Sequence, residues 1–328
     1  MFNLLRYNGT IDFLKYSWLS ALFSLAIFTT FIGTYLYRYN TTGETFNYSV
    51  DFTGGIEVLL KFNKPVSGEK IAEVLEKNGW SKPVTREFAP DEHLVRIKRE
   101  TKNVQAESQK LKADLESGLG NDYKIDILST DSVGGATGSK LWTQSFYAIV
   151  IALLLMLLYI GARFFSVSYA MGAIVSLFHD AIVILTIFLL LNKEISINVI
   201  GAILAVLGYS INDTIVIFSR IRENIAKFPS LSMREVINKS ITETLSRTIL
   251  TTISTLLVVV SLFIFGGETL RDLALALLIG IIFGIYSTIF IANPILLMLY
   301  RKSGSGALNQ DKSTLRAKAT SHVGTSHN

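Results

Sequence analysis

The sequence lacks cysteine altogether and has little proline, histidine or charge: five prolines, four histidines and 17% charged residues in a chain of 328. The absence of cysteine excludes a disulfide framework and thiol chemistry. The histidines lie far apart, without the paired spacing of metal ligands, so we expect no metal site and no bound cofactor. Ordinary soluble domains carry about 25% charged residues, so this chain is not an ordinary soluble protein.

Long apolar segments take the place of charge. Half of the residues are hydrophobic, and the mean hydropathy is +0.42. A hydrocarbon core about 30 Å thick is crossed by roughly 20 helical residues. We predict six transmembrane helices at residues 16–37, 141–161, 167–191, 195–219, 245–265 and 273–300. The first is too long and bulky for a cleaved signal peptide and is expected to stay as an anchor.

Basic residues predict the orientation. They gather in residues 1–15, in the connection 220–244 and in the tail 301–328, and short basic connections stay in the cytoplasm. Both termini are therefore expected in the cytoplasm, with residues 38–140 outside. The net charge of +5 fits attraction to anionic membrane lipid and requires no nucleic-acid partner. The polar tail 301–328 is expected to be disordered.

Residues 38–140 have the pattern of a small folded domain. Apolar alternation predicts strands at 56–62, 84–88, 93–99 and 123–128, and capped amphipathic segments predict helices at 67–78 and 103–117. The order β-α-β-β-α-β is that of the ferredoxin-like motif. The predicted fold class is thus a polytopic α-helical membrane protein with one α+β, ferredoxin-like extracytoplasmic domain between helices 1 and 2.

A glycine-rich stretch, 134–140, resembles a phosphate-binding loop. However, Ser139 separates its last glycine from Lys140, and a membrane span follows. We interpret the stretch as a flexible hinge. Because the domain shows no catalytic constellation, we do not expect an enzyme.

Charge inside the apolar segments carries the functional information. Asp213 lies about 9 Å from the cytoplasmic end of span four, where a carboxylate costs about 2.5 to 3.5 kcal/mol even on lenient insertion scales. It is placed at the edge of a small-residue face that another helix can approach closely. That face consists of Gly201, Ala205, Gly208 and Asn212. Asp213 is therefore expected to point into the helix bundle.

Span five supplies a partner for Asp213. Arg247 begins that span on the same side of the membrane, and a long arginine side chain can reach deeper along the helix. It opens a polar stripe at helical spacing that continues through Thr251, Ser254 and Ser261. Two interpretations stay open: an ion pair that fixes helix register, or a proton-handling pair.

Spans three and six add further polar and small residues. His179 and Asp180 form a second polar pair near the middle of span three, interpreted either as part of a relay or as buried packing. Gly280, Gly284 and Ser287 of span six form another close-packing face.

Several motifs, in the same order and spacing, resemble the SecD/SecF family of bacterial protein-export subunits, which is related to the resistance-nodulation-division transporters. The resemblance lies with the SecF branch and covers residues 16 to about 300. Its motifs are Asp51-Phe-Thr-Gly-Gly, His179-Asp180, Leu207-Gly-Tyr-Ser-Ile-Asn-Asp-Thr, Arg220-Ile-Arg-Glu-Asn, Thr244-Leu-Ser-Arg-Thr and Phe265-Gly-Gly.

The resemblance implies a multi-pass protein of the bacterial cytoplasmic (inner) membrane that forms a heteromer with SecD. It further implies association with the SecYEG channel and YajC. The implied function is to use the proton-motive force for late, outer-side steps in the translocation of unfolded polypeptide. Asp213 and Arg247 match the family residues implicated in proton passage, and we place Asn212, Asp180 and His179 in the same relay.

Other features leave choices open. Asp51, Gly54 and Gly55 are interpreted either as a hinge at the base of the domain or as a tight turn entering a strand. Relatives usually have an aspartate at Ser219 and a proline at Gly135, and neither departure removes the proposed relay. Two other functions are considered: a half-transporter that exports lipid or small molecules, and a non-conducting scaffold of the translocase.

Overall fold

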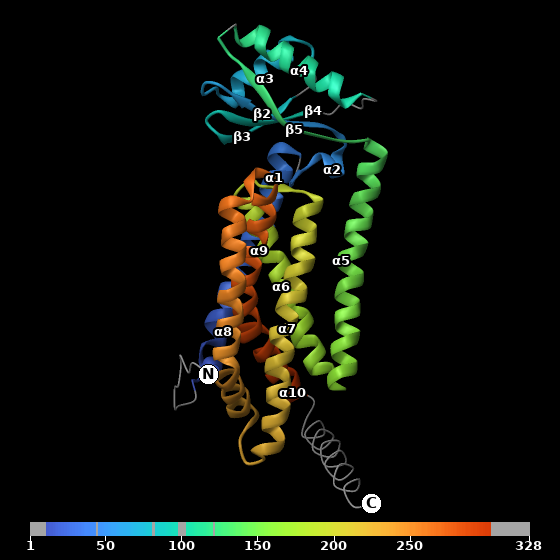
Figure 1. Cartoon of the computed structure of the whole chain (residues 1–328). Helices are drawn as coiled ribbons and strands as arrows, with labels where there is room; N and C mark the ends of the chain where they lie inside the picture. The colour runs from blue at the N-terminus through green and yellow to red at the C-terminus, as the bar shows by residue number, and fades with distance from the viewer. Residues whose placement is uncertain (1–10, 44, 81–82, 98–102, 121, 303–328) are drawn as a thin grey trace, which may run out of the picture. The chain divides into compact units, whose positions relative to one another are not determined.

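The computed structural model describes residues 11–43, 45–80, 83–97, 103–120 and 122–302, and these fall into two compact units (Figure 1). We call one the sheet domain, which comprises Phe46–Ala148 and Asn192–Ile200. The other, the helical unit, comprises the described residues of Met1–Thr45, Ile149–Leu191 and Gly201–Asn328. The expected disordered tail from residue 303 lies outside the described residues.

The sheet domain has the predicted β-α-β-β-α-β order. Its elements are β2 (Gly55–Phe62), α3 (Gly68–Lys77), β3 (Val84–Ala89), β4 (Glu92–Ile97), α4 (Val104–Leu119) and β5 (Ile125–Val133). The strands lie side by side as β3-β4-β2-β5, with every pair antiparallel. This is the ferredoxin-like arrangement, and it confirms the predicted α+β fold.

Local signals in the sequence begin both helices of this domain. The Ser67 hydroxyl accepts a hydrogen bond from the Lys70 amide at the start of α3, and the Asn103 side chain accepts one from Ala106 at the start of α4. Both bonds satisfy amides that have no partner within the helix. Gly79, with φ of +81°, follows α3 in the left-handed conformation that favours glycine.

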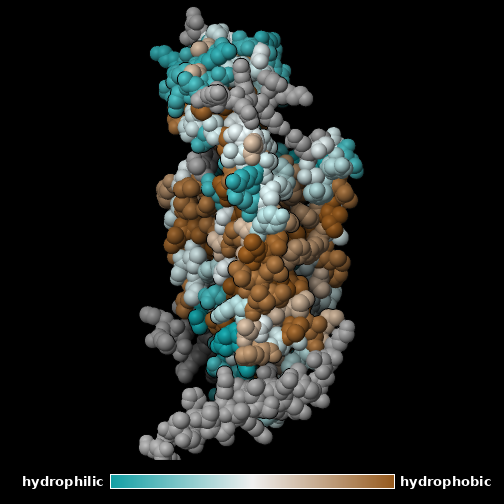
Figure 2. Space-filling model, turned by 90° about the vertical axis from the view of Figure 1, so that its right-hand side faces the viewer, coloured by the Kyte–Doolittle hydropathy of each residue, from teal (hydrophilic) through white to brown (hydrophobic). Residues whose placement is uncertain are grey.

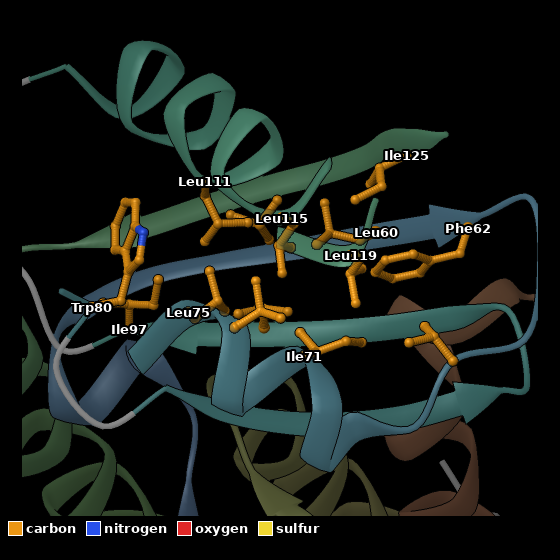
Figure 3. Close-up of a cluster of buried hydrophobic side chains, with 14 of the residues drawn as sticks. Leu60, Phe62, Ile71, Leu75, Trp80, Ile97, Leu111, Leu115, Leu119 and Ile125 are labelled. Atoms are coloured by element: carbon orange, nitrogen blue, oxygen red, sulfur yellow. The ribbon is translucent and has the colours of Figure 1, made fainter. Parts of the chain in front are cut away.

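The core of the sheet domain lies between its helices and one face of its sheet. Val58 and Leu60, alternate residues of β2, belong to one buried cluster with Leu75 of α3 and Leu115 of α4. Figure 3 labels Leu60, Leu75 and Leu115 in this cluster. Trp80 closes one end of this core, and its indole nitrogen donates to an Asp114 carboxylate oxygen at 2.8 Å. The period of two along the strand therefore produces one buried face.

The opposite face of the sheet carries a buried charge cluster. Glu57 of β2 and Arg96 of β4 lie opposite each other in register, and the Arg96 guanidinium donates to Glu57 at 3.2 Å. Arg96 also contacts Glu194, which comes from a segment far along the chain. Burial, followed by the charge of Glu194, raises the pKa of the Glu57 carboxyl to about 7, although Arg96 opposes the change.

Three short elements of the sheet domain were not predicted. They are β1 (Asn47–Tyr48), α2 (Val50–Thr53) and β6 (Glu194–Ile195), and β1 pairs with β6 in parallel. The flexible hinge predicted at 134–140 is wrong, because a helix begins at Gly135 and includes Lys140. A Cβ atom on Gly138 would lie 2.8 Å from the Phe52 carbonyl oxygen, so glycine serves close backbone approach there.

The helices are α1 (Ser17–Thr42, preceded by the short helix η1, Phe13–Tyr16), α5 (Gly135–Phe164), α6 (Val167–Leu190), α7 (Ile197–Lys227), α8 (Met233–Phe265), α9 (Gly267–Ser287), the π-helix η2 (Thr288–Ala292) and α10 (Asn293–Lys302). Among the described residues, six helical stretches are long and apolar enough to cross a membrane, which confirms the predicted number. The chain is therefore a multi-pass membrane protein. Hydrophobic side chains dominate the surface over these helices in Figure 2.

Helices α7 and α8 continue beyond their apolar segments. Only residues 228–232 separate them, and Ser232 and Glu235 form a capping box at the start of α8. Beside this turn, Arg220 of α7 donates to Glu243 of α8 at 2.7 Å. Hydropathy marks only the apolar part of each helix. Most of the connection predicted at residues 220–244 is therefore helical and belongs to polar turns of α7 and α8.

The six spans differ in how far the chain itself covers them. About half of the residues in the most apolar stretch of α6, of α7 and of the last span are buried. Only 6% are buried in α1, 11% in α5 and 17% in α8. Helix α6 packs against α1, α9 and α10, and α8 packs against α9. Helices α6, α7 and α9–α10 therefore form the centre of the helical unit.

Leu115→Ala should destabilise the sheet domain by about 2 to 5 kcal/mol, because it leaves a cavity in a core position that is fully buried. Urea unfolding of the detergent-solubilised chain, followed by Trp80 fluorescence with Trp18 and Trp142 replaced by phenylalanine, measures the change. Leu128→Ala, at a position that is 48% exposed in the same domain, is the matched control and should cost much less. Equal losses would contradict the described core.

Glu57→Gln should remove a fall in stability of the sheet domain between about pH 4.5 and about pH 7. The raised pKa of Glu57 means that the folded domain binds this proton more tightly than the unfolded chain. Its contribution is therefore fully present below about pH 4.5 and is lost as the pH rises through about 7. The same urea assay, repeated across this range, should give a flatter profile for the variant. Parallel profiles would show that Glu57 is ionised throughout.

Candidate functional site

Asp213 is buried in α7 with two residues of α8 as neighbours. Its side chain is only 7% exposed. Thr248 and the charge of Arg247 act on the carboxylate, although no hydrogen bond joins the Thr248 hydroxyl to it. Both residues lie in the described part of the chain, yet no direct ion pair joins Asp213 to Arg247, whose own side chain is exposed. The carboxylate therefore feels a positive charge at the edge of the bundle.

Asp180 of α6 forms a second buried centre. The Ser210 hydroxyl of α7 donates to an Asp180 carboxylate oxygen at 2.7 Å, and Ser287 of α9 lies beside the same carboxylate. His179 Nδ1 lies 3.6 Å from the other oxygen, longer than a hydrogen bond. A Cβ atom on Gly284 would lie 3.4 Å from Ser210, so glycine lets α9 approach this group closely.

One face of α7 connects the two centres. Ser210, Asp213 and Thr214 stand at positions i, i+3 and i+4, which are neighbours on a helix surface. Thr214 is hydrogen-bonded to Thr288 at 3.0 Å between the two hydroxyl oxygens. Hydroxyl groups thus continue from the Asp180 centre along α7 toward the last span.

The helix that carries Thr288 is irregular at this point. Residues Thr288–Ala292 form a π-helix, a distortion that often occurs at functional sites. The Asn293 side chain donates to the Thr288 carbonyl oxygen at 2.8 Å. A Cβ atom on Gly172 of α6 would lie 2.7 Å from the Ala292 carbonyl oxygen, so α6 touches the distorted backbone directly.

A second set of predicted residues lies on the surface of this chain. Asn212, Thr251 and Ser254 are exposed, and the two hydroxyl groups donate to carbonyl oxygens of their own helix at 3.0 and 2.8 Å. A Cβ atom on Gly201 or Gly208 would meet no atom of the chain within 4 Å. A polar, glycine-containing face at membrane depth is costly against lipid, so it is suited to a partner helix or to water.

Gly280 behaves differently from Gly201 and Gly208. A Cβ atom at Gly280 would lie 2.4 Å from a methyl group of Val206 in α7. Among the predicted packing glycines, Gly280 and Gly284 therefore bring α9 against α7 within the chain.

The residues predicted as a hinge or turn lie in the sheet domain. Asp51 accepts hydrogen bonds from the Ser49 hydroxyl at 2.9 Å and from the Ile197 amide at 3.0 Å. Gly54 and Gly55 have φ of +71° and +122°, and a Cβ atom on Gly54 would lie 2.7 Å from Gly135 Cα. Glycine at position 54 is thus required by its conformation and by its neighbour.

Sequence reasoning missed most of the hydroxyl groups at the two centres. Ser210, Thr214 and Thr248 stood in the family motifs without a role of their own, and Thr288 was not named, although the first two share a helix face with Asp213. Their spacing from the aspartate was the available signal. Within the described residues, no three His, Asp or Glu side chains converge as a metal site would.

Comparison with known proteins identifies relatives over most of the chain. Residues 114–302 match the family model described as "Protein export membrane protein SecD/SecF, C-terminal", and residues 43–66 match the SecD/SecF GG motif. The chain is 38% identical over 260 residues to the protein translocase subunit SecF of Thermodesulfovibrio yellowstonii, covering 78% of this chain and 85% of that one. It is 34% identical over 301 residues to SecF of Vibrio alginolyticus, covering 91% and 93%.

A solved structure agrees with these matches. The crystal structure of SecDF from Thermus thermophilus, a translocon-associated membrane protein, superposes with a TM-score of 0.80 at 31% identity and covers 91% of this chain. This chain spans only 40% of that protein. The sequence relatives, the family model and the superposition agree, and the chain belongs to the SecD/SecF family as a SecF subunit of the protein translocase.

Proposed function

We propose that this SecF chain works with SecD to use the proton-motive force for late, outer-side steps of protein translocation, with Asp213 as the group that gains and loses the proton. The observation that carries the proposal is the burial of Asp213 between Thr248 and the charge of Arg247. A carboxyl group inside a membrane protein is costly and is usually functional.

The chemistry follows from the two charge states of Asp213. An ionised carboxylate attracts the positively charged guanidinium of Arg247. A neutral carboxyl group does not, so protonation removes the electrostatic attraction between α7 and α8 at this position. A proton crossing about 150 mV supplies about 3.5 kcal/mol, which shifts a two-state equilibrium several hundredfold.

The second centre extends the proposed proton path. Asp180, Ser210, Thr214 and Thr288 offer a carboxylate and hydroxyl groups that can donate and accept protons. Asn212, Thr251 and Ser254 would line the outer part of the path, where water or a partner reaches the exposed face. His179 stands next to Asp180 and completes the proposed relay.

The exposed face also supports the proposed partner. The name SecDF combines SecD and SecF, and this chain covers 40% of that protein. We propose that a SecD subunit covers the face formed by Gly201, Gly208 and Asn212. The proposed setting is the bacterial inner membrane, with cytoplasmic termini and the sheet domain outside. SecYEG, YajC and the unfolded translocating polypeptide are the further partners.

Asp213→Asn should reduce export to the level seen without a proton gradient, because asparagine keeps the shape of aspartate but cannot cycle between charge states. The measurement is export of a secreted protein into inverted membrane vesicles, with and without an ionophore that collapses the gradient.

Asp126→Asn is the matched control for Asp213→Asn, since it makes the same chemical change at an exposed aspartate of the sheet domain, outside the proposed path. It should leave export and its response to the ionophore unchanged. If Asp213→Asn still responds to the ionophore like the parent chain, the proton role is wrong. An unstable variant that no longer binds SecD would favour the scaffold function. Gradient-driven lipid or drug efflux by the purified chain would favour the half-transporter.

Gly208→Ile should leave the isolated chain stable but weaken co-purification of SecD, because position 208 is open in the chain itself. Gly280→Ile should instead destabilise the chain by about 1 to 3 kcal/mol, since the side chain would overlap Val206. Thermal unfolding in detergent and affinity purification with a tagged chain measure the two effects. Unchanged SecD recovery with Gly208→Ile would move the interface to another face.

A further inference from the structure

The short segment before α7 is held by the start of the sheet domain. Strand β1 pairs in parallel with β6, with Asn47 opposite Glu194, and the Ser49 amide donates to the Ile195 carbonyl oxygen at 3.0 Å. The Asn47 side chain adds hydrogen bonds to the Asn192 backbone carbonyl and side-chain oxygens at 3.1 and 2.9 Å. Two segments far apart in sequence therefore form one small, continuous structure.

Buried charges strengthen this attachment. Arg96 of β4 contacts one carboxylate oxygen of Glu194, and Arg86 of β3 lies 3.9 Å from the other. The Glu194 side chain is 12% exposed and that of Arg96 is 8% exposed, so solvent screens the pair weakly. Arg96 also donates to the Tyr48 carbonyl oxygen at 2.5 Å, which connects the four-stranded sheet to β1.

Asp51 provides the contact with the helix itself. Its carboxylate accepts from the Ile197 amide at 3.0 Å, at the first residue of α7, while the Ser49 hydroxyl holds the same oxygen at 2.9 Å. Amides in a first helical turn have no partner within the helix, and a negative charge there also favours the helix dipole. The Asp51 side chain thus caps a helix that begins far away in sequence.

The base of the domain leaves Asp51 little freedom. Asp51 belongs to α2, the short helix that ends at Gly54. A Cβ atom on Gly54 would lie 2.7 Å from Gly135 Cα, and one on Gly138 would lie 2.8 Å from the Phe52 carbonyl oxygen. Backbone therefore packs on backbone at this point, so α2 is fixed against the first turns of α5.

We infer that Asp51, Arg96 and Glu194 form a clasp through which the first turn of α7 moves together with the sheet domain. They are positioning residues for the helix that carries Asp213 further along. The clasp lies entirely within the sheet domain. Its use in export rests on the proposed proton function. Arg96 is shared between Glu57, opposite it on β2, and Glu194, while Asp131 of β5 lies on the other side of Glu57.

Hydrogen exchange in the whole chain, reconstituted with lipid, tests the clasp directly. Asp51→Ala and Glu194→Gln should each raise amide exchange in residues 197–200 about tenfold, because a charge-assisted hydrogen bond or ion pair is lost. Asp51→Asn keeps an acceptor at the cap and should restore part of the protection. Exchange at Val95 in β4 reports whether the domain stays folded.

Glu92→Gln is the matched control. It removes an acid from the same sheet, where Glu92 pairs with Lys61 at 2.6 Å outside the clasp, and it should leave residues 197–200 protected. Unchanged protection in both Asp51→Ala and Glu194→Gln would overturn the clasp, as would equal exposure in Glu92→Gln.

An export assay separates the clasp from the proton function. With a proton gradient present, Asp51→Ala should lose gradient-stimulated export while Asp213 and its neighbours are intact, and Asp51→Asn should recover part of it. Loss of α7 protection with undiminished gradient stimulation would overturn the transmitting role. If the parent chain itself shows no gradient stimulation, the proposed function fails, and the exchange result still decides whether the clasp exists.

Discussion

The helical unit depends on how it accommodates two carboxyl groups, Asp180 and Asp213, among apolar helices. Asp180 in α6 takes a hydrogen bond from Ser210 in α7, whereas Asp213 in α7 has Thr248 and Arg247 of α8, all described residues, as neighbours without a hydrogen bond or ion pair to either. Removing the Ser210 hydroxyl would leave the Asp180 carboxyl group without that hydrogen bond in a water-poor interior, at a cost of about 1 to 3 kcal/mol. Asp180 therefore holds α6 against α7, and α7 also carries the Asp213 carboxyl group beside α8.

The sheet domain follows the same principle with a different balance of charges. Arg96 is buried between Glu57 and Glu194, so one cation serves two acids from different segments. Glu57 holds its proton up to about pH 7 because burial and Glu194 disfavour its ionised form. Together with Asp51 at the start of α7, these contacts make the segment 192–200 part of the sheet domain and not a free connection.

The sequence predicts the parts of this structure that have a period or a cap. Apolar length gave the six spans, and Ser67 and Asn103 correctly gave the starts of α3 and α4. The elements β1, β6 and α2 span only two to four residues each, so they show no period and form through partners distant in sequence. The stretch around Gly138 was wrongly predicted to be a hinge, because glycine permits both backbone flexibility and close backbone approach. Only the nearby Phe52 carbonyl oxygen shows that close approach is the reason for glycine here.

The candidate site was predicted in its charges but not in its hydroxyl groups. An aspartate in an apolar helix is conspicuous, whereas Ser210 and Thr248 resemble ordinary helix-packing residues until their neighbours are known. The exposed Arg247 adds a physical constraint. Its charge acts on the buried Asp213 yet stands on a face that the chain leaves open, so whatever covers that face alters the electrostatic environment of the carboxylate. In the proposed mechanism, the partner surface and the proton site are consequently one electrostatic unit.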